Sequence, residues 1–293
     1  MHHTNVILMF GTSGIRGVYK KDIDEEFVLS VARIFAESDI VLGRDTRKSS
    51  PAISRAIEAG VLSRGKDVVS LGIVPTPTVA LGTIKHNSGG IMVTASHNPE
   101  EYNGIKLLEN GKELSRKREK EIEDAFKKGL GIEAKTDGRV VEDKDIINDH
   151  VSLIASLVDV DKIAEKKPKV IVDCNGAASV ITPLVLRKLG CTVTSINASA
   201  EGFSRPSEPT EENLYYLKGL VPKLGADFAV AHDGDGDRCV IFDENGGILG
   251  QDVQLSLMIE HELSKSENRN IVTTTEAFIK HYFNFMLYKI RFK

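Results

Sequence analysis

Residues 233–238 read Asp-Gly-Asp-Gly-Asp-Arg, so three carboxylates alternate with two glycines and a cation closes the run. At neutral pH the charges of Asp233, Asp235 and Asp237 repel one another, and a divalent cation is the usual compensation. Because the run offers only oxygen donors, a hard ion such as Mg²⁺ fits better than zinc. The run therefore predicts a metal site of the kind that serves phosphate chemistry.

The residues on either side of this acidic turn decide between a metal-binding turn and its alternatives. Residues 227–232 and 239–242 are apolar and β-branched enough to predict a strand on each side. An EF-hand would need glycine where Arg238 stands and helices where the strands are predicted, although Glu244 falls at its twelfth position. We reject the EF-hand; a hydrophilic turn without a metal remains the plain alternative.

A second pattern, Thr-Ala-Ser-His-Asn-Pro at residues 94–99, follows directly on an apolar strand. Loops at the carboxyl ends of strands are where α/β sheets place their ligands. Ser96 is a candidate nucleophile or phosphate carrier, although a serine hydroxyl needs a base or a metal to assist it. His97 lies next to it in the chain. Taken alone, the pattern is equally typical of an ordinary Asx/Pro turn.

Three further segments carry weaker signals. Glycines in residues 10–17 let backbone N–H groups approach an anion, and Arg16 offers a guanidinium to phosphate oxygens. Residues 43–47 hold two arginines just after a predicted strand, for which surface charge with a local Arg–Asp pair is the alternative. Residues 102–106 end on Lys106, and a lysine that begins a strand is usually a solvated edge residue.

Composition limits the class of protein. The 293 residues carry a net charge of −4, so no basic surface invites nucleic acid, and no apolar run is long enough to span a bilayer. Residues 1–10 predict a first strand rather than a signal peptide. The three cysteines are scattered and fit neither a disulfide framework nor a zinc site, which suits a reducing cytoplasm.

Strands alternate with helices along most of the chain, which predicts an α/β fold with mixed, mostly parallel sheets. We expect one helix over residues 150–163, a hairpin at Asn110 and Gly111, and a strand over residues 270–273. The polar stretch 129–149 contains the first boundary. The expected organisation is two complete consecutive α/β domains and a partial third, at residues 1–145, 146–249 and 250–293.

Together the five segments resemble the α-D-phosphohexomutase superfamily, which includes phosphoglucomutase, phosphomannomutase and phosphoglucosamine mutase. The resemblance is carried, in the family's order, by "FGTSGIRG", "GRDTR", "TASHNP", "YNGIKL" and "DGDGDR". It extends to about Phe278, and the pair formed by "TASHNP" and "DGDGDR" is highly specific.

The resemblance implies an isomerase that interconverts hexose 1-phosphate and hexose 6-phosphate. Ser96 would be a phosphoserine that donates phosphate and recovers it from a reoriented 1,6-bisphosphate. Mg²⁺ would be held by a phosphoserine oxygen on Ser96 and by Asp233, Asp235 and Asp237. Lys106 would be the general acid/base, helped to lose its proton by the metal and Arg16, with His97 as the second candidate. Arg238 completes the catalytic set, and the phosphate-binding set is Thr12, Ser13, Arg16, Arg44 and Lys106.

The chain departs from the family pattern toward its carboxyl end. The sugar-selecting "GE-x-SGH" loop and the "R-x-SGT-EP" loop for the distal phosphate do not occur; residues 204–209 come nearest to the latter but lack its core. Residues 282–293 are dense in aromatics without a turn or cap, so we expect a truncated or frame-shifted product, with a natural two-domain variant as the alternative. Which hexose is used stays open.

The expected partners are a hexose phosphate and either a separate carboxyl-terminal half or a second copy that associates through the incomplete third domain. Two other functions remain. The chain is a non-catalytic or slowly phosphatase-like fragment, or it is an unrelated Mg²⁺ phosphatase with an aspartyl nucleophile. The last leaves "TASHNP" unexplained.

Overall fold

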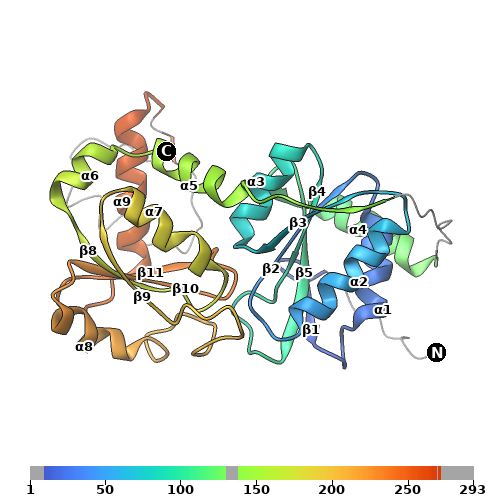
Figure 1. Cartoon of the computed structure of the whole chain (residues 1–293), viewed down its shortest axis with the longest axis horizontal. Coiled ribbons are helices and arrows are strands. Elements are labelled where there is room, and N and C mark those ends of the chain that lie inside the picture. The colour runs from blue at the N-terminus through green and yellow to red at the C-terminus, as the bar shows by residue number, and fades with distance from the viewer. Residues whose placement is uncertain (1–9, 130–137, 269, 272–293) are drawn as a thin grey trace.

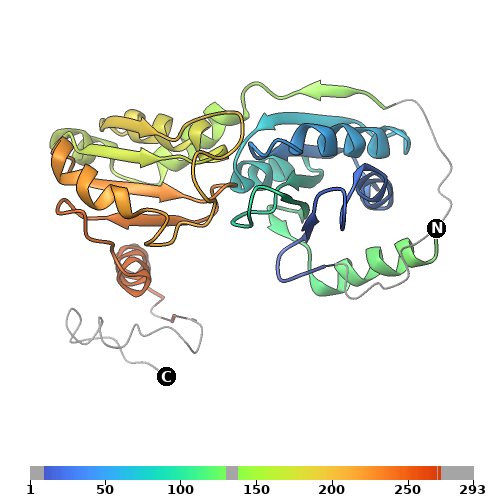
Figure 2. The same cartoon turned by 90° about the horizontal axis from the view of Figure 1, so that it is seen from below.

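The computed structural model describes residues 10–129, 138–268 and 270–271. Two α/β units follow one another along the chain and lie side by side, each with helices packed on a sheet (Figures 1 and 2). The expected α/β class with mixed sheets is confirmed. The strand predicted at residues 1–10 and the aromatic end lie outside the described residues, as does most of the strand predicted at 270–273. The domain boundaries at 145 and 249 stay predictions.

The first sheet has the order β1-β5-β4-β2-β3-β7, with β6 paired to β5. Strands β4, β2, β3 and the edge strand β7 are parallel, whereas β1, β5 and β6 run antiparallel to their neighbours. The strands are β1 Ile15–Val18, β2 Ile40–Arg44, β3 Val68–Ile73, β4 Gly89–Val93, β5 Tyr102–Glu109, β6 Lys112–Glu113 and β7 Val140–Glu142.

Helices cover both faces of this sheet because its strands alternate between two apolar cores. In β2, Ile40 and Leu42 belong to the core beneath α1 and α2, whereas Val41 belongs to the core beneath α3. Pro51 lies in the first turn of α2, and the Ser115 side chain caps α4. The helices are α1 Glu25–Phe35, α2 Ser50–Leu62, α3 Thr76–His86 and α4 Arg116–Lys127.

The second sheet has the order β11-β10-β8-β9, in which only β11 is antiparallel to its neighbour. Residues of α5 and α7 share a core with one face of this sheet, and residues of α8 share a core with the other. The elements are α5 Ile146–Ser156, α6 Val160–Lys166, β8 Lys169–Asp173, a 3₁₀ turn at Ala177–Val180, α7 Thr182–Lys188, β9 Thr192–Ile196, α8 Tyr215–Leu224, β10 Phe228–His232, β11 Cys239–Phe242 and α9 Gln251–Lys265.

The single helix expected over residues 150–163 is wrong, because the structure has two helices there. Asp159 has an extended backbone and its side chain accepts from the Lys162 N–H, so it starts α6 as an N-cap instead of continuing α5. By contrast, the hairpin is confirmed: Asn110 and Gly111, both with positive φ, join β5 to β6.

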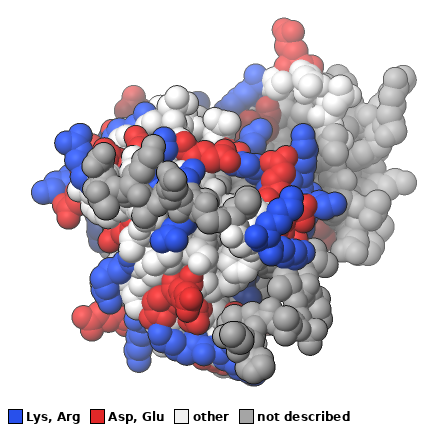
Figure 3. Space-filling view, turned by 90° about the vertical axis from the view of Figure 1, so that its right-hand side faces the viewer, with Lys and Arg blue, Asp and Glu red and all other residues white. Residues whose placement is uncertain are grey.

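Two further findings concern the charges on one face of the molecule and the apolar character of its helices. Figure 3, which views the structure from the side of the first unit, shows Lys and Arg interspersed with Asp and Glu, so this face carries no field of one sign. Within the ranges that the structure describes, no helix combines the length and the apolar character needed to cross a bilayer.

Candidate active site

The two most informative motifs of the sequence meet where the two units adjoin. The Ser96 Oγ donates a hydrogen bond to Asp233 Oδ2 at 2.8 Å, although 137 residues separate them. Ser96 follows β4 and Asp233 follows β10, so each lies just beyond the carboxyl end of a strand in its own sheet. Both residues are buried. The junction therefore brings a candidate phosphate carrier against a candidate metal ligand.

The backbone at Ser96 has a conformation that a non-glycine residue seldom adopts. Its φ is +50°, in the left-handed region, which costs on the order of 1 kcal/mol or more. Its carbonyl oxygen accepts from Arg47 Nη2 and from Ser207 Oγ, each at 2.8 Å, and its N–H donates to Thr94 Oγ1 at 2.8 Å. These bonds hold the strained turn and thereby fix the direction of the hydroxyl.

Arg47 is the main support of this loop. Its side chain is fully buried and pairs with buried Asp45, Nε to Oδ2 at 3.0 Å. The guanidinium also donates to four backbone carbonyls, those of Ser96, Asn98, Pro99 and Tyr102. The reading of residues 43–47 as surface charge is therefore wrong for this pair, because both members are enclosed by the loop that they hold.

Arg47→Met is expected to unfold the protein more easily, by about 3–5 kcal/mol, because it leaves the Asp45 carboxylate buried without its cation. Four carbonyls lose their donor in the same change. The measurement is urea denaturation followed by circular dichroism. The neighbouring Lys48→Met, at an exposed position, is the control; equal losses for the two variants would contradict the role of Arg47.

The acidic turn gathers one carboxylate oxygen each from Asp233, Asp235 and Asp237 within 4.8 Å of one another. Asp233 and Asp235 are buried, and Asp235 Oδ1 is a buried oxygen without a hydrogen-bond partner among the described residues. A buried carboxylate oxygen without a partner is unfavourable unless a cation or a donor reaches it. Three oxygen donors and this orphaned atom fit a hard divalent cation such as Mg²⁺.

Lys106 lies against the same carboxylates. Its side chain is 1% exposed, and Nζ is 2.7 Å from Asp235 Oδ2 and 2.6 Å from Asp237 Oδ2. The expectation of a solvated lysine at a strand end is wrong, because Lys106 lies in the middle of β5. Burial lowers its pKa, but the charges and hydrogen bonds of Asp235 and Asp237 outweigh burial and raise it. These neighbours therefore hold the proton on the amine, opposite to the expected lowering.

The electrostatics of the turn are those of crowded negative charge. Burial, with the charges of Asp235 and Asp237, raises the pKa of Asp233 to about 8. Burial also acts to raise the pKa of Asp235, but the charge of Lys106 and its hydrogen bond lower it overall. The lysine thus compensates Asp235. Among the described residues, the Asp233 carboxylate accepts only from the Ser96 hydroxyl and from the Arg238 N–H.

His97 and Arg16 lie beside Ser96. The Nδ1 of His97 is 3.4 Å from Ser96 Oγ, and burial, with the charges of Arg238 and Arg16, lowers the pKa of His97. The Nη1 of Arg16 donates to Asn98 Oδ1 at 3.3 Å, while its Nε is buried without a hydrogen-bond partner among the described residues. Both predicted residues therefore lie at the loop that carries the candidate phosphate.

The remaining predicted residues contact this centre less directly. The Arg238 N–H donates to Asp233 Oδ1 at 3.1 Å, and its half-exposed side chain faces Glu208. The hydroxyl of Ser13 donates to Glu113, whose Oε1 is 3.9 Å from Lys106 Nζ. In the described chain, no hydrogen bond or ion pair joins Thr12 or Arg44 to the acidic turn or to Ser96; Arg44 donates to the Asp45 carbonyl.

Comparisons with known proteins show which family the chain belongs to. Two family models match the chain: "Phosphoglucomutase/phosphomannomutase, alpha/beta/alpha domain I" over residues 8–131 and the corresponding "domain II" over residues 148–247. The chain belongs to this family. The resemblance inferred from the five sequence segments is confirmed.

The chain is similar to curated proteins and to solved structures over most of its own length. A "Phosphoglucomutase/phosphomannomutase" of Thermococcus kodakarensis is 41% identical over 281 residues, which cover 91% of this chain and 62% of the relative. A "Probable phosphoglucosamine mutase" of Methanobrevibacter smithii is 40% identical over 92% of this chain and 61% of the relative. The chain thus spans about three fifths of the length of these relatives. Among solved structures, a phosphoglucomutase/phosphomannomutase family protein from Burkholderia thailandensis matches with a TM-score of 0.76 at 26% identity, over 88% of this chain and 59% of that one.

Sequence reasoning missed several residues of the site in this family member. Thr76, at the start of α3, donates to Asp235 Oδ2 from its hydroxyl at 2.5 Å and to the Asp235 carbonyl from its N–H at 2.9 Å. Arg47 and Ser207 hold the Ser96 carbonyl. None of these contacts is marked by a local pattern, since each partner lies in a distant segment of the chain.

Proposed function

We propose that this chain carries the phosphate-donating part of an α-D-phosphohexomutase. Ser96, as a phosphoserine, gives its phosphoryl group to a hydroxyl of a hexose phosphate, and it recovers a phosphoryl group from the other end of the resulting 1,6-bisphosphate. The observation that supports this most is the 2.8 Å hydrogen bond between Ser96 Oγ and Asp233 Oδ2, which joins the carrier to the acidic turn.

The proposed phosphoryl transfer needs no reactant other than the phosphoserine, the sugar and a base. The bond from phosphorus to Ser96 Oγ breaks while a bond from phosphorus to the sugar oxygen forms, and the proton of the sugar hydroxyl passes to a base. We assign that proton to Lys106 and keep His97 as the second candidate; Asp235 and Asp237, which raise the pKa of Lys106, must release the amine before it can accept the proton. Lys106 Nζ lies within 2.7 Å of two turn carboxylates, and His97 Nδ1 lies 3.4 Å from Ser96 Oγ. The second transfer reverses these changes at the other end of the sugar.

The residues that would hold Mg²⁺ are Asp233, Asp235 and Asp237, together with a phosphoserine oxygen on Ser96. When bound, the ion supplies charge neutralisation for the phosphoryl group and for the oxygen that leaves it. The protein's own part is to hold the carboxylate oxygens in place. The Thr76 hydroxyl donates a hydrogen bond to Asp235, and the Arg238 N–H donates one to Asp233. Positioning of this kind is the main requirement of phosphoryl transfer.

The proposed phosphate-binding set uses cations and hydroxyls around Ser96. Arg16 supports its assignment best, because its Nε is buried and lacks a hydrogen-bond partner among the described residues, and a guanidinium matches phosphate oxygens. Arg238 lies beside Asp233, to which its backbone N–H donates. We keep Arg44, Thr12, Ser13 and Lys106 in the set because they lie in segments that match the family pattern, and their contribution is a matter for mutagenesis.

The substrate is proposed as a class. The two relatives are named for different sugars, so hexose phosphate is the level that the similarity supports. The sugar-selecting and distal-phosphate motifs do not occur in the sequence. We therefore propose the complete interconversion only together with a second chain, or second half, that supplies them. All three cysteines are free in the structure, in keeping with the proposed cytoplasmic location.

The first half of the reaction can be tested on this chain alone, since it requires only Ser96 and its neighbours. The purified chain is incubated with Mg²⁺ and glucose 1,6-bisphosphate and is then weighed intact by mass spectrometry. We expect one added phosphate on the wild type and on Ser204→Ala, at an exposed position, and none on Ser96→Ala. If the wild type and Ser96→Ala gain the same amount of phosphate, Ser96 is not the phosphate carrier.

A further inference from the structure

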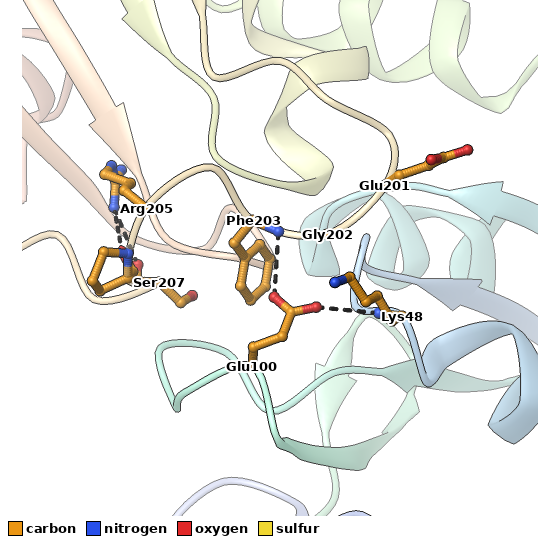
Figure 4. A pocket seen from close by; sticks show the side chains of 8 residues that line it. Lys48, Glu100, Glu201, Gly202, Phe203, Arg205 and Ser207 are labelled. Atoms are coloured by element: carbon orange, nitrogen blue, oxygen red, sulfur yellow. Dashed lines mark hydrogen bonds between the residues drawn. The ribbon is translucent and has the colours of Figure 1, made fainter.

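The segment of residues 202–207, which the structure leaves without regular secondary structure, is attached to the first unit at one end. It lines a pocket of about 330 Å³ (Figure 4). The Gly202 N–H donates to the Thr46 carbonyl at 2.7 Å. The Glu100 carboxylate accepts from the Phe203 N–H and from the Lys48 N–H, each at 3.3 Å, and lies between them in the figure. The segment therefore docks against loops of the first sheet.

The same segment is anchored to the second sheet by two side chains. Asn175 Oδ1 accepts from the Ser204 and Arg205 N–H groups, at 3.0 and 3.1 Å. The Arg205 Nε is 2.9 Å from Asp173 Oδ2, and its Nη2 donates to the His232 carbonyl at 2.6 Å. Since Asp173 ends β8 and His232 ends β10, this segment is fixed at the same sheet edge as the acidic turn.

Ser207, at the end of this segment, bonds to the backbone of both functional loops through a single oxygen. Its side chain is buried, and Oγ donates to the Ser96 carbonyl at 2.8 Å while it accepts from the Gly234 N–H at 2.9 Å. Gly234 lies between Asp233 and Asp235 in the turn. A hydroxyl can donate and accept at once, which alanine cannot do and a thiol does only weakly.

We propose that Ser207 is a positioning residue that sets the separation between the Ser96 hydroxyl and the turn carboxylates. The proposal rests on the proposed phosphoryl transfer at Ser96. Ser207 acts through backbone groups and has no assigned contact with substrate. Its loss should therefore slow the transfer while leaving the concentration of bisphosphate that half-saturates the reaction unchanged.

The test compares Ser207→Ala with Ser204→Ala, a serine of the same segment that is exposed and contributes only its N–H to the anchor. Single-turnover phosphorylation of Ser96 by glucose 1,6-bisphosphate is expected to slow by roughly 10- to 100-fold in Ser207→Ala, as for a small misplacement or the loss of an outer-shell partner. Ser204→Ala keeps the wild-type rate. Ser207→Cys, nearly the same size, is expected to slow as well.

A rate for Ser207→Ala within twofold of the wild type overturns the proposal, as does a loss that appears wholly in the half-saturating concentration. Circular dichroism shows whether each variant is folded; Ser207→Cys provides the comparison if the alanine variant is not. A calorimetric titration with Mg²⁺ alone separates this proposal from the proposed function. If the wild type accepts no phosphate, the function has failed; a roughly 10-fold weaker Mg²⁺ affinity of Ser207→Ala then supports the positioning role, and an unchanged affinity overturns it.

Discussion

Asp233→Asn is expected to abolish the rise in melting temperature that Mg²⁺ gives the wild-type chain. The substitution keeps the size of the side chain but removes one of three charged ligands gathered within 4.8 Å. Loss of an outer-shell partner already costs roughly 10- to 100-fold in metal affinity, and loss of a direct ligand costs more. A cation at 100 times its dissociation constant stabilises a protein by about 2.7 kcal/mol. Loss of this stabilisation is large enough to measure as a change in melting temperature.

Without Mg²⁺ the same variant is expected to melt no lower than the wild type. Burial and the adjacent carboxylates raise the pKa of Asp233 to about 8, so near neutral pH its ionisation favours the unfolded chain, and a neutral amide removes that cost. Differential scanning fluorimetry with and without Mg²⁺ gives both numbers, and Asp161→Asn, at an exposed position on α6, is the matched control. If Mg²⁺ raises the melting temperature of Asp233→Asn as much as that of the wild type, the acidic turn is not the metal site.

The contact between Ser96 and Asp233 shows how far local sequence reasoning reaches. Each loop could be recognised where it stands, because an apolar strand precedes it and its residue types are suited to ligands. Nothing in the spacing of the two motifs shows that loops 137 residues apart are in contact. That inference came from the resemblance to a family, in which the two motifs occur in the same order.

Lys106 and Arg47 show why the rest of the site could not be predicted. In β5, Ile105 and Leu107 lie in the core under α1 and α2, whereas Leu108 lies in the core under α3. A strand covered on both faces buries polar residues too, and the sequence alone does not reveal which faces are covered. Arg47 bonds chiefly to backbone carbonyls, and a carbonyl carries no residue-specific signal.

The errors in secondary structure have a similar origin. Strand β7 has three exposed residues, too few for a periodic pattern, and it forms only because β3 offers a parallel neighbour. The break between α5 and α6 depends on the cap at Asp159, whose side chain must point at the right N–H. Such features are decided by tertiary pairing or by one side-chain direction rather than by composition.

Lys106→Met is expected to destabilise the chain strongly in the absence of Mg²⁺ and much less in its presence. Lys106 is 1% exposed and bonds to Asp235 and Asp237, so its removal leaves buried negative charge without a compensating cation. Breaking such a pair costs about 3–5 kcal/mol, which lowers the melting temperature of a chain of this size by on the order of 10 °C. Methionine retains the length of the side chain, so the loss of charge is the main change.

The dependence on Mg²⁺ distinguishes this effect from simple damage to the core. The ammonium and a divalent cation would compensate the same carboxylate oxygens, so removal of the ammonium should tighten the binding of Mg²⁺ while it weakens the fold without the ion. The exposed Lys112→Met, in the neighbouring strand β6, is the control. A melting-temperature deficit of Lys106→Met that is the same with and without saturating Mg²⁺ would mean that the lysine and the ion do not share ligands. In that case the acidic turn is compensated by Lys106 alone, and its three carboxylates would need another explanation.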